Sequence, residues 1–141
     1  MFLSNIFTLQ GLLSLLYSLP AILIALSFHE FAHAWAANKM GDPTAKNLGR
    51  LTVDPIKHLD LVGTICLILF RFGWAKPVPI NPRNFRKPVQ GEILVSLAGV
   101  AMNFLVSFVA AAVLYIFYGS VMTVADVPSI IIFYIMILNI Y

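Results

Sequence analysis

The stretch that decides the fold runs from Leu12 to Asn38 and reads LLSLLYSLPAILIALSFHEFAHAWAAN. No charged residue occurs between Met1 and Phe28. A helix of this length measures about 40 Å, which exceeds the roughly 30 Å hydrocarbon core of a bilayer. Gly41-Asp42-Pro43 is expected to end it. The sequence therefore predicts a membrane-spanning helix over residues 12–38.

The end of this helix carries the motif His29-Glu30-Phe31-Ala32-His33. His29 and His33 are four residues apart, so they project from one face of a helix. Two imidazoles at that spacing can bind one zinc ion, and Glu30 between them can act on metal-bound water. The alternative, a buried polar cluster without a metal, would leave three costly unpaired groups in lipid. The motif therefore predicts a zinc peptidase site at membrane depth.

The composition agrees with a membrane protein. The chain is 60% hydrophobic and 11% charged, against about 45–50% and about 25% in soluble domains. We therefore expect an α-helical integral membrane protein that passes the cell membrane several times, with the lipid bilayer as a partner and no nucleic acid. The single cysteine, Cys66, excludes an internal disulfide. Nothing in the sequence indicates the oligomeric state.

Two more apolar stretches follow. Residues 91–118 are predicted to form a second full span, and small residues such as Ala98 and Gly99 are expected to pack it closely against the histidine helix. Residues 129–141 are predicted to begin a third. The uncharged run from 127 to 141 gives only about 22 Å of helix, less than the bilayer core. We expect a chain cut inside a span, with a helix buried part-way in the membrane as the alternative.

The region between the two full spans is basic, because all nine Lys and Arg residues lie between Lys39 and Lys87. A short strand is expected at residues 47–53. Residues 58–72 are predicted to form a re-entrant segment or a short span, since their apolar part is brief. Basic residues flank this segment on both sides, which places both flanks in the cytoplasm. The N-terminus is then outside, and the helix at 91–118 runs outward.

The run from Gly73 to Pro82 contains three prolines, which forbid a helix and favour an extended loop or a poorly paired strand. One reading is a connector held at the level of the lipid headgroups. The other is an edge to which a substrate segment adds as a strand. Because prolines blunt a strand edge, the connector is preferred.

Taken together, these motifs resemble the site-2 protease family of intramembrane zinc metallopeptidases, in its compact bacterial branch without a PDZ domain. The similarity extends over nearly the whole chain, from about Pro20 to Tyr141. It is carried by the histidine motif and by five further segments in matching order: Gly41 to Ala45, Gly49 to Thr52, Asp54-Pro55 with His58 and Asp60, Gly73 to Pro82, and Leu97 to Gly99 with Asn103.

The resemblance implies roles for individual residues. His29 and His33 would be zinc ligands, and Glu30 would take a proton from the attacking water and pass it to the leaving amine. Asn103 would lie near the metal and stabilise the oxyanion or hold the substrate. Its alternative role is an interhelical hydrogen bond. The implied substrate is a transmembrane segment of another membrane protein.

The sequence departs from the family in two places. The family's third zinc ligand is an aspartate in a Leu-Asp-Gly motif, which residues 1–141 do not contain, so the chain is predicted to be a single peptidase core that is incomplete at its C-terminus. Val100 also stands where the family usually has proline. The possible substitutes are Asp54, Asp60, Glu92, Asp126 and His58. His58 and Asp60 are more typical of capping or local hydrogen bonding, and Asp126 is predicted on the far side from His33.

Two functions from different classes remain open on the sequence. The first is a membrane-embedded zinc endopeptidase that cleaves transmembrane segments. The second is a catalytically incomplete fragment or a non-proteolytic membrane relative that binds metal weakly. A metal transporter is less favoured, because nothing suggests a paired repeat.

Overall fold

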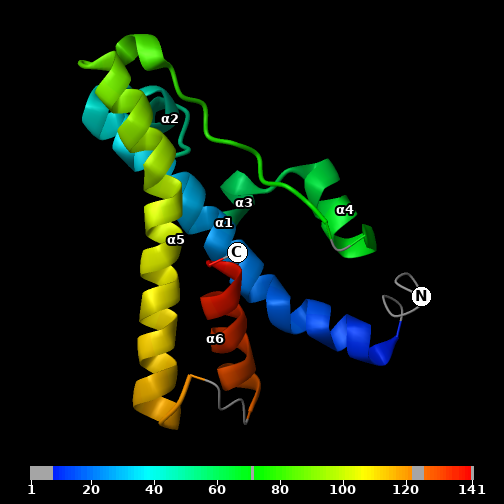
Figure 1. The fold of residues 1–141 in the computed structure, drawn as a ribbon. Coiled ribbons are helices and arrows are strands. Elements are labelled where there is room, and N and C mark those ends of the chain that lie inside the picture. Colours follow the sequence, from blue (N-terminus) through cyan, green and yellow to red (C-terminus); the bar gives the residue numbers. More distant parts are fainter. Residues whose placement is uncertain (1–7, 71, 122–125, 141) are drawn as a thin grey trace.

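The computed structural model describes residues 8–70, 72–121 and 126–140, and most of these residues are helical. Three helices form the main body: α1, α5 and α6 all contact one another. Figure 1 shows α5 and the shorter α6 side by side, with α1 crossing them. The elements in chain order are α1 (Leu9–Met40), α2 (Thr44–Asn47), α3 (Pro55–His58), α4 (Leu61–Phe70), the 3-10 turn η1 (Pro82–Asn84), α5 (Pro88–Tyr118) and α6 (Val127–Leu138).

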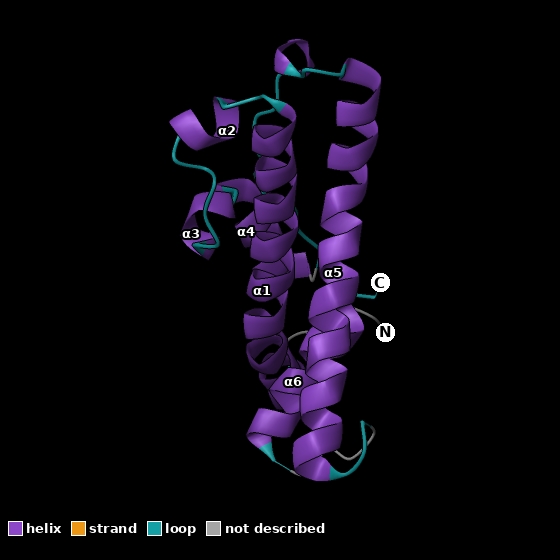
Figure 2. Ribbon diagram, turned by 90° about the vertical axis from the view of Figure 1, so that its left-hand side faces the viewer, coloured by secondary structure: helices purple, strands orange, loops and turns teal. Residues whose placement is uncertain are grey.

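Helices α1 and α5 are both long and apolar enough to cross a membrane. Only 22% of the most apolar part of α1 and 17% of that of α5 are buried inside the protein. Large side chains such as Phe108 and Ile116 are instead more than 70% exposed. A core helix of a soluble protein would hide these groups, so the outward apolar surface favours membrane association. Figure 2 shows the two long helices lying beside each other.

The ends of α1 have local causes. The Thr8 hydroxyl accepts a hydrogen bond from the Gly11 N–H at the start, and Gly41 ends the helix in the left-handed conformation, with φ of 113°. The predicted stop at Gly41 is confirmed. The helix is longer than the predicted 12–38, because Thr8 caps it three residues earlier and because it continues to Met40.

The other two predicted spans are found with shifted boundaries. Helix α5 begins at Pro88, three residues before the expected start, because proline fits the first turn of a helix. It ends, as expected, at Tyr118. Helix α6 begins at Val127 rather than at residue 129, because Asp126 and Ser129 form a reciprocal capping box that starts the helix earlier. It ends at Leu138, whereas the predicted span continued to residue 141. Tyr141 itself lies outside the described residues.

The predicted strand at residues 47–53 is wrong, and no strand occurs within 8–70, 72–121 or 126–140. The backbone N–H groups of residues 47–50 donate instead to the carbonyls of residues 43–46, in and after the helical turn α2. Gly49 then takes a left-handed conformation, with φ of 67°, and breaks the extended run. Between the long helices, the described residues 41–70 and 72–87 contain one isolated bridge, Leu59 to Ala75, and no strand.

Helix α4 occupies the predicted re-entrant segment at 58–72. Its ten residues give about 15 Å of helix, which is too short to cross a bilayer core unaided. A Cβ atom on Gly63 would overlap the Trp74 backbone, and one on Gly73 would overlap the Gly63 carbonyl. These two glycines therefore let α4 fold back closely onto the chain that follows it. Entry of α4 into the bilayer stays a prediction.

The Asp42 side chain links the end of α1 by hydrogen bonds to the residues that lead into α5. Its Oδ1 accepts hydrogen bonds from the Thr44 backbone N–H at 3.1 Å, the Thr44 hydroxyl and the Asn84 side-chain amide at 2.8 Å, and its Oδ2 accepts from the Asn81 N–H at 2.7 Å. Burial alone would raise the pKa of the Asp42 carboxyl, but the hydrogen bonds from Thr44, Asn81 and Asn84 outweigh it and lower the pKa. Asp42 is therefore a carboxylate at neutral pH.

Candidate functional site

The imidazole rings of His29 and His33, both on α1, bring their Nε2 atoms close together. The His29 Nε2 and His33 Nε2 atoms are 3.0 Å apart, and the rings meet edge to face with centroids 4.6 Å apart. Zinc bonds to imidazole measure about 2.0–2.1 Å, so two ligands of a tetrahedral zinc ion lie about 3.3 Å apart. The pair therefore needs only a small adjustment to hold one metal ion.

A backbone carbonyl fixes the orientation of one of these rings. His33 Nδ1 lies 2.6 Å from the Val95 carbonyl oxygen of α5. A carbonyl can only accept, so the proton resides on Nδ1 and the lone pair of the neutral ring is on Nε2. Metal-binding histidines commonly donate their second N–H in this way, which sets the tautomer and the ring direction. His33 is thus prepared as a ligand by a residue 62 positions away.

Gly99 of α5 leaves open the space in front of both imidazoles. A Cβ atom at this position would lie 2.5 Å from His29 Nε2 and 2.5 Å from His33 Nε2. That is close to where a shared metal ion would stand. Gly99 was expected to allow close packing of α5 against the histidine helix. In the structure it faces the imidazoles of His29 and His33 directly.

Glu30 is held by a backbone group rather than by a side chain. Its Oε2 atom accepts a hydrogen bond of 2.8 Å from the Val78 N–H. Val78 belongs to the proline-containing run that follows α4, so this run lies across α1 at the site. The contact could not be read from sequence, although Pro77 and Pro79 on either side do indicate an extended chain there.

Asn103 of α5 lies next to His29, and its carboxamide interacts with that imidazole. The Asn103 Oδ1 atom is buried, and no hydrogen-bond partner of good geometry is found for it among the described residues. A buried acceptor without a partner is costly and needs an explanation. His29, His33 and Asn103 thus lie between α1 and α5, and Glu30 lies beside His29 on α1 with its carboxylate against Val78. Their catalytic and metal-binding roles stay predictions.

The other candidate ligands are used elsewhere. Asp54, Asp60 and Asp126 accept backbone N–H groups at the starts of α3, α4 and α6. His58 is buried, and its Nε2 lies 2.8 Å from the Thr52 carbonyl. In residues 8–70, 72–121 and 126–140, no group of three His, Cys, Asp or Glu side chains is placed to hold a metal. The histidine pair and the open space at Gly99 fit zinc, but they supply two ligands where catalytic zinc normally has three.

An apolar cavity of about 420 Å³ adjoins the site between α1, α5 and α6. Phe28 and Met102, the chain neighbours of His29 and Asn103, both line it. The remaining lining residues are all aliphatic: Ile24, Leu105, Val106, Val109, Ala110, Val113, Ile132 and Ile135. The cavity extends along α5 toward α6, which the Ser107 hydroxyl ties to α5 through the Met136 carbonyl at 2.8 Å.

Comparison with known proteins finds a similar chain in Bacillus subtilis (strain 168), named "Putative zinc metalloprotease YwhC". The two are 47% identical over 93 residues, which make up 66% of this chain and 42% of that relative. The matched region thus spans less than half of the relative's length. No family model and no solved structure matches this chain. The similarity suggests a zinc metalloprotease, in agreement with the donor set of the site.

Proposed function

We propose that this chain forms the metal-binding core of an intramembrane zinc metalloprotease of the site-2 type. The observation that carries the proposal is the convergence of His29 Nε2 and His33 Nε2, 3.0 Å apart, on a helix apolar and long enough to span a bilayer. Glu30 lies between the two histidines in sequence, as the motif for such chemistry requires. The relative's name and its 47% identity support zinc and proteolysis.

In this proposal His29 and His33 hold the metal through Nε2, and a third ligand completes the set. When bound, zinc polarises the scissile carbonyl and lowers the pKa of a coordinated water toward about 7. Glu30 accepts the proton of the attacking water and returns it to the leaving amine. The hydrogen bond from the Val78 N–H keeps one carboxylate oxygen in place and leaves the other free for the proton.

Asn103 is proposed to contact the substrate. Its buried Oδ1 atom has no hydrogen-bond partner of good geometry among the described residues. An acceptor of this kind suits an N–H group of the substrate backbone. The amide nitrogen of the same side chain is the group that would stabilise a developing oxyanion.

The proposed substrate is a transmembrane segment of another membrane protein. The apolar cavity beside Phe28 and Met102 supports this, because aliphatic side chains of such a segment would fit there without losing hydrogen bonds. The exposed apolar surfaces of α1 and α5 support a place among lipids, as a multi-pass protein of the cell membrane. The basic residues between Lys39 and Lys87 support a cytoplasmic location for the chain between α1 and α5.

A second candidate function is a non-proteolytic membrane protein that binds metal weakly. It is favoured by one observation, that the described residues offer no third His, Cys, Asp or Glu beside the histidine pair. The two candidates differ in a simple outcome. Only the protease makes cleavage of a transmembrane reporter depend on zinc.

The proposal is tested by metal removal. The protein is reconstituted into liposomes with a reporter whose transmembrane segment carries a fluorophore and a quencher. We expect a zinc chelator to reduce cleavage to the level of protein-free liposomes, and added zinc to restore it. Cleavage that persists after chelation, with the metal content measured and shown to be negligible, would contradict the zinc mechanism. Failure to cleave with zinc at saturation would favour the second candidate.

A further inference from the structure

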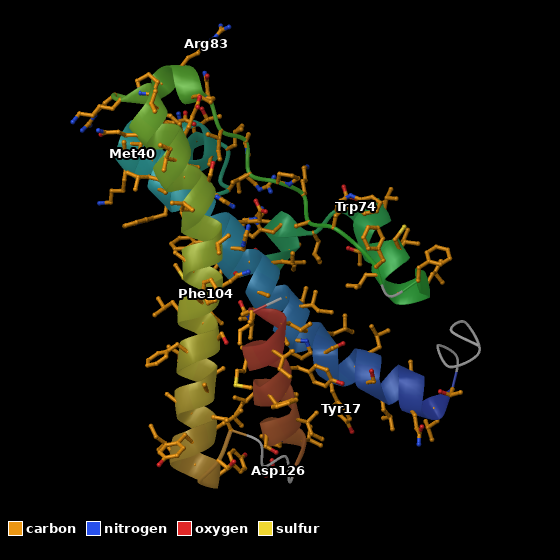
Figure 3. All side chains as sticks on the ribbon, viewed as in Figure 1. Tyr17, Met40, Trp74, Arg83, Phe104 and Asp126 are labelled. Atoms are coloured by element: carbon orange, nitrogen blue, oxygen red, sulfur yellow. The ribbon has the colours of Figure 1, made fainter. Side chains whose placement is uncertain are left out.

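Residues 75–81, here called the strap, run in an extended conformation from the end of the α4 turn toward η1. Figure 1 shows this segment as the long connection that climbs from α4 to the start of α5, and Figure 3 marks its beginning next to Trp74. The Val78 side chain is buried in a cluster with Ala34 of α1 and Ala45 of α2. The strap therefore packs on α1 one turn beyond Glu30, and its Val78 N–H reaches the Glu30 carboxylate at 2.8 Å.

The register of the strap matters, because its backbone has few donors. Pro77 and Pro79 flank Val78 and have no N–H group. A slip of the strap by one residue in either direction would present a proline nitrogen to Glu30. A slip of one residue would therefore remove the hydrogen bond to the Glu30 carboxylate, so the position of the strap along α1 must be fixed.

One end of the strap is fixed by the polypeptide around α3. The Lys76 N–H donates to the His58 carbonyl at 2.8 Å, and the Lys76 carbonyl accepts from Arg50 Nη2 at 2.6 Å. Leu59 and Ala75 form the isolated bridge at the same place. These contacts fix the strap on the N-terminal side of Val78. Its C-terminal end, at Asn81, is held by a different residue.

The far end is fixed by Asp42, whose side chain has no exposed surface. Its Oδ2 atom accepts the Asn81 N–H at 2.7 Å, while its Oδ1 atom accepts from Thr44 and from the Asn84 side chain. The carboxylate thus joins the end of α1 to the last residue of the strap. All four hydrogen bonds that join the Asp42 side chain to Thr44, Asn81 and Asn84 are accepted by its two oxygens, as a carboxylate can do.

We propose that Asp42 is a positioning residue for catalysis, which fixes the register of the strap so that the Val78 N–H holds the Glu30 carboxylate. This inference rests on the proposed function, in which Glu30 moves the proton. Asp42 itself touches neither the histidine pair nor the substrate site. It acts through Asn81, the strap and Val78.

The first arm of the test needs no turnover. Asp42→Asn keeps the shape of the side chain but replaces one accepting oxygen with a donor. Residue-resolved hydrogen exchange in lipid nanodiscs is measured at Val78 and Asn81. We expect both amides to exchange at least about tenfold faster in the variant, because Asn81 loses its carboxylate acceptor and the strap no longer holds the Val78 N–H against Glu30. The matched control is Asp54→Asn, another aspartate that accepts an N–H two residues on, at Ile56, and does not touch the strap.

The second arm is a double-mutant cycle on reporter cleavage. Val78→Pro removes the N–H that Glu30 accepts, and Val78→Ala removes side-chain packing but keeps that N–H. We expect Asp42→Asn and Val78→Pro each to lower kcat about tenfold or more, with KM little changed and Val78→Ala affected less. In the Val78→Pro background, Asp42→Asn should lower kcat no further, because both act through one hydrogen bond.

The outcomes are distinguishable. Wild-type exchange at Val78 in Asp42→Asn, or additive losses of kcat in the double variant, would overturn the positioning role while leaving the protease proposal intact. Absence of cleavage in the wild type would overturn the proposed function, and the exchange arm would still decide on the strap. If Asp42→Asn does not fold, Asn81→Pro deletes the N–H that Asp42 Oδ2 accepts and is expected to speed exchange at Val78 in the same way. Asn81→Ala is its control, because it also loses the side-chain oxygen that accepts the Arg83 N–H but keeps the Asn81 N–H.

Discussion

Replacing Glu30 with glutamine is expected to abolish cleavage of a transmembrane reporter while the metal is kept. The glutamine carbonyl can still accept the Val78 N–H, so the side chain stays in place and only its basicity is lost. General acid–base groups contribute about 10²–10⁴-fold to rate, and the loss of kcat should lie in that range. The measurement is kcat in proteoliposomes, with the zinc content of each sample determined by mass spectrometry.

The chain offers a matched control for this change. Glu92 is the one other glutamate, and it is exposed in the first turns of α5. Glu92→Gln makes the same chemical change away from the site, and we expect wild-type kinetics. Undiminished cleavage by Glu30→Gln would remove Glu30 from the proton-transfer role. Loss of the metal along with activity would instead point to Glu30 as a ligand.

Replacing Gly99 with alanine is expected to remove metal binding. The new methyl carbon would stand 2.5 Å from both Nε2 atoms, within the space that a shared zinc ion needs. At least one imidazole must then turn away. Loss of a group that only orients a ligand typically costs 10–100-fold in metal affinity, so displacement of a ligand should cost at least about 100-fold. The affinity is measured by competition with a chromogenic zinc chelator.

Gly91→Ala is the control for damage to α5. A Cβ atom at Gly91 is equally crowded, at 2.5 Å from Phe85 Cδ2, but it meets a phenyl ring instead of the histidine pair. We expect Gly91→Ala to keep wild-type zinc affinity, whatever it does to stability. Equal losses of affinity in both variants would mean that Gly99 matters for helix packing alone.

The parts of the fold that could be predicted from the sequence are those that depend on hydropathy and on helix-capping residues. Helices α1 and α5 follow from long uncharged stretches, and Gly41 marks the end of α1. The histidine motif predicted which side chains share a face of α1, since that depends only on helical geometry. The boundaries shifted by two or three residues where Thr8, Pro88 and Asp126 cap helices earlier than hydropathy indicates.

The parts that sequence could not predict depend on backbone groups brought together by the tertiary fold. The Val95 carbonyl that orients His33 and the Val78 N–H that holds Glu30 have no side-chain signature. The strand expected at residues 47–53 failed for a related reason. Local backbone hydrogen bonds from residues 47–50 to residues 43–46 and the left-handed Gly49 decided that segment, and no strand lies beside it in the described part of the chain.

The central claim is that His29 and His33 bind one zinc ion together, and X-ray absorption at the zinc edge tests it without any need for catalysis. We expect zinc-loaded protein to show two imidazole ligands at about 2.0–2.1 Å. His33→Ala should show one, and the variant lacking both histidines should bind no zinc above background. A spectrum without imidazole in the wild type, or one that the double variant leaves unchanged, would contradict the metal site on α1.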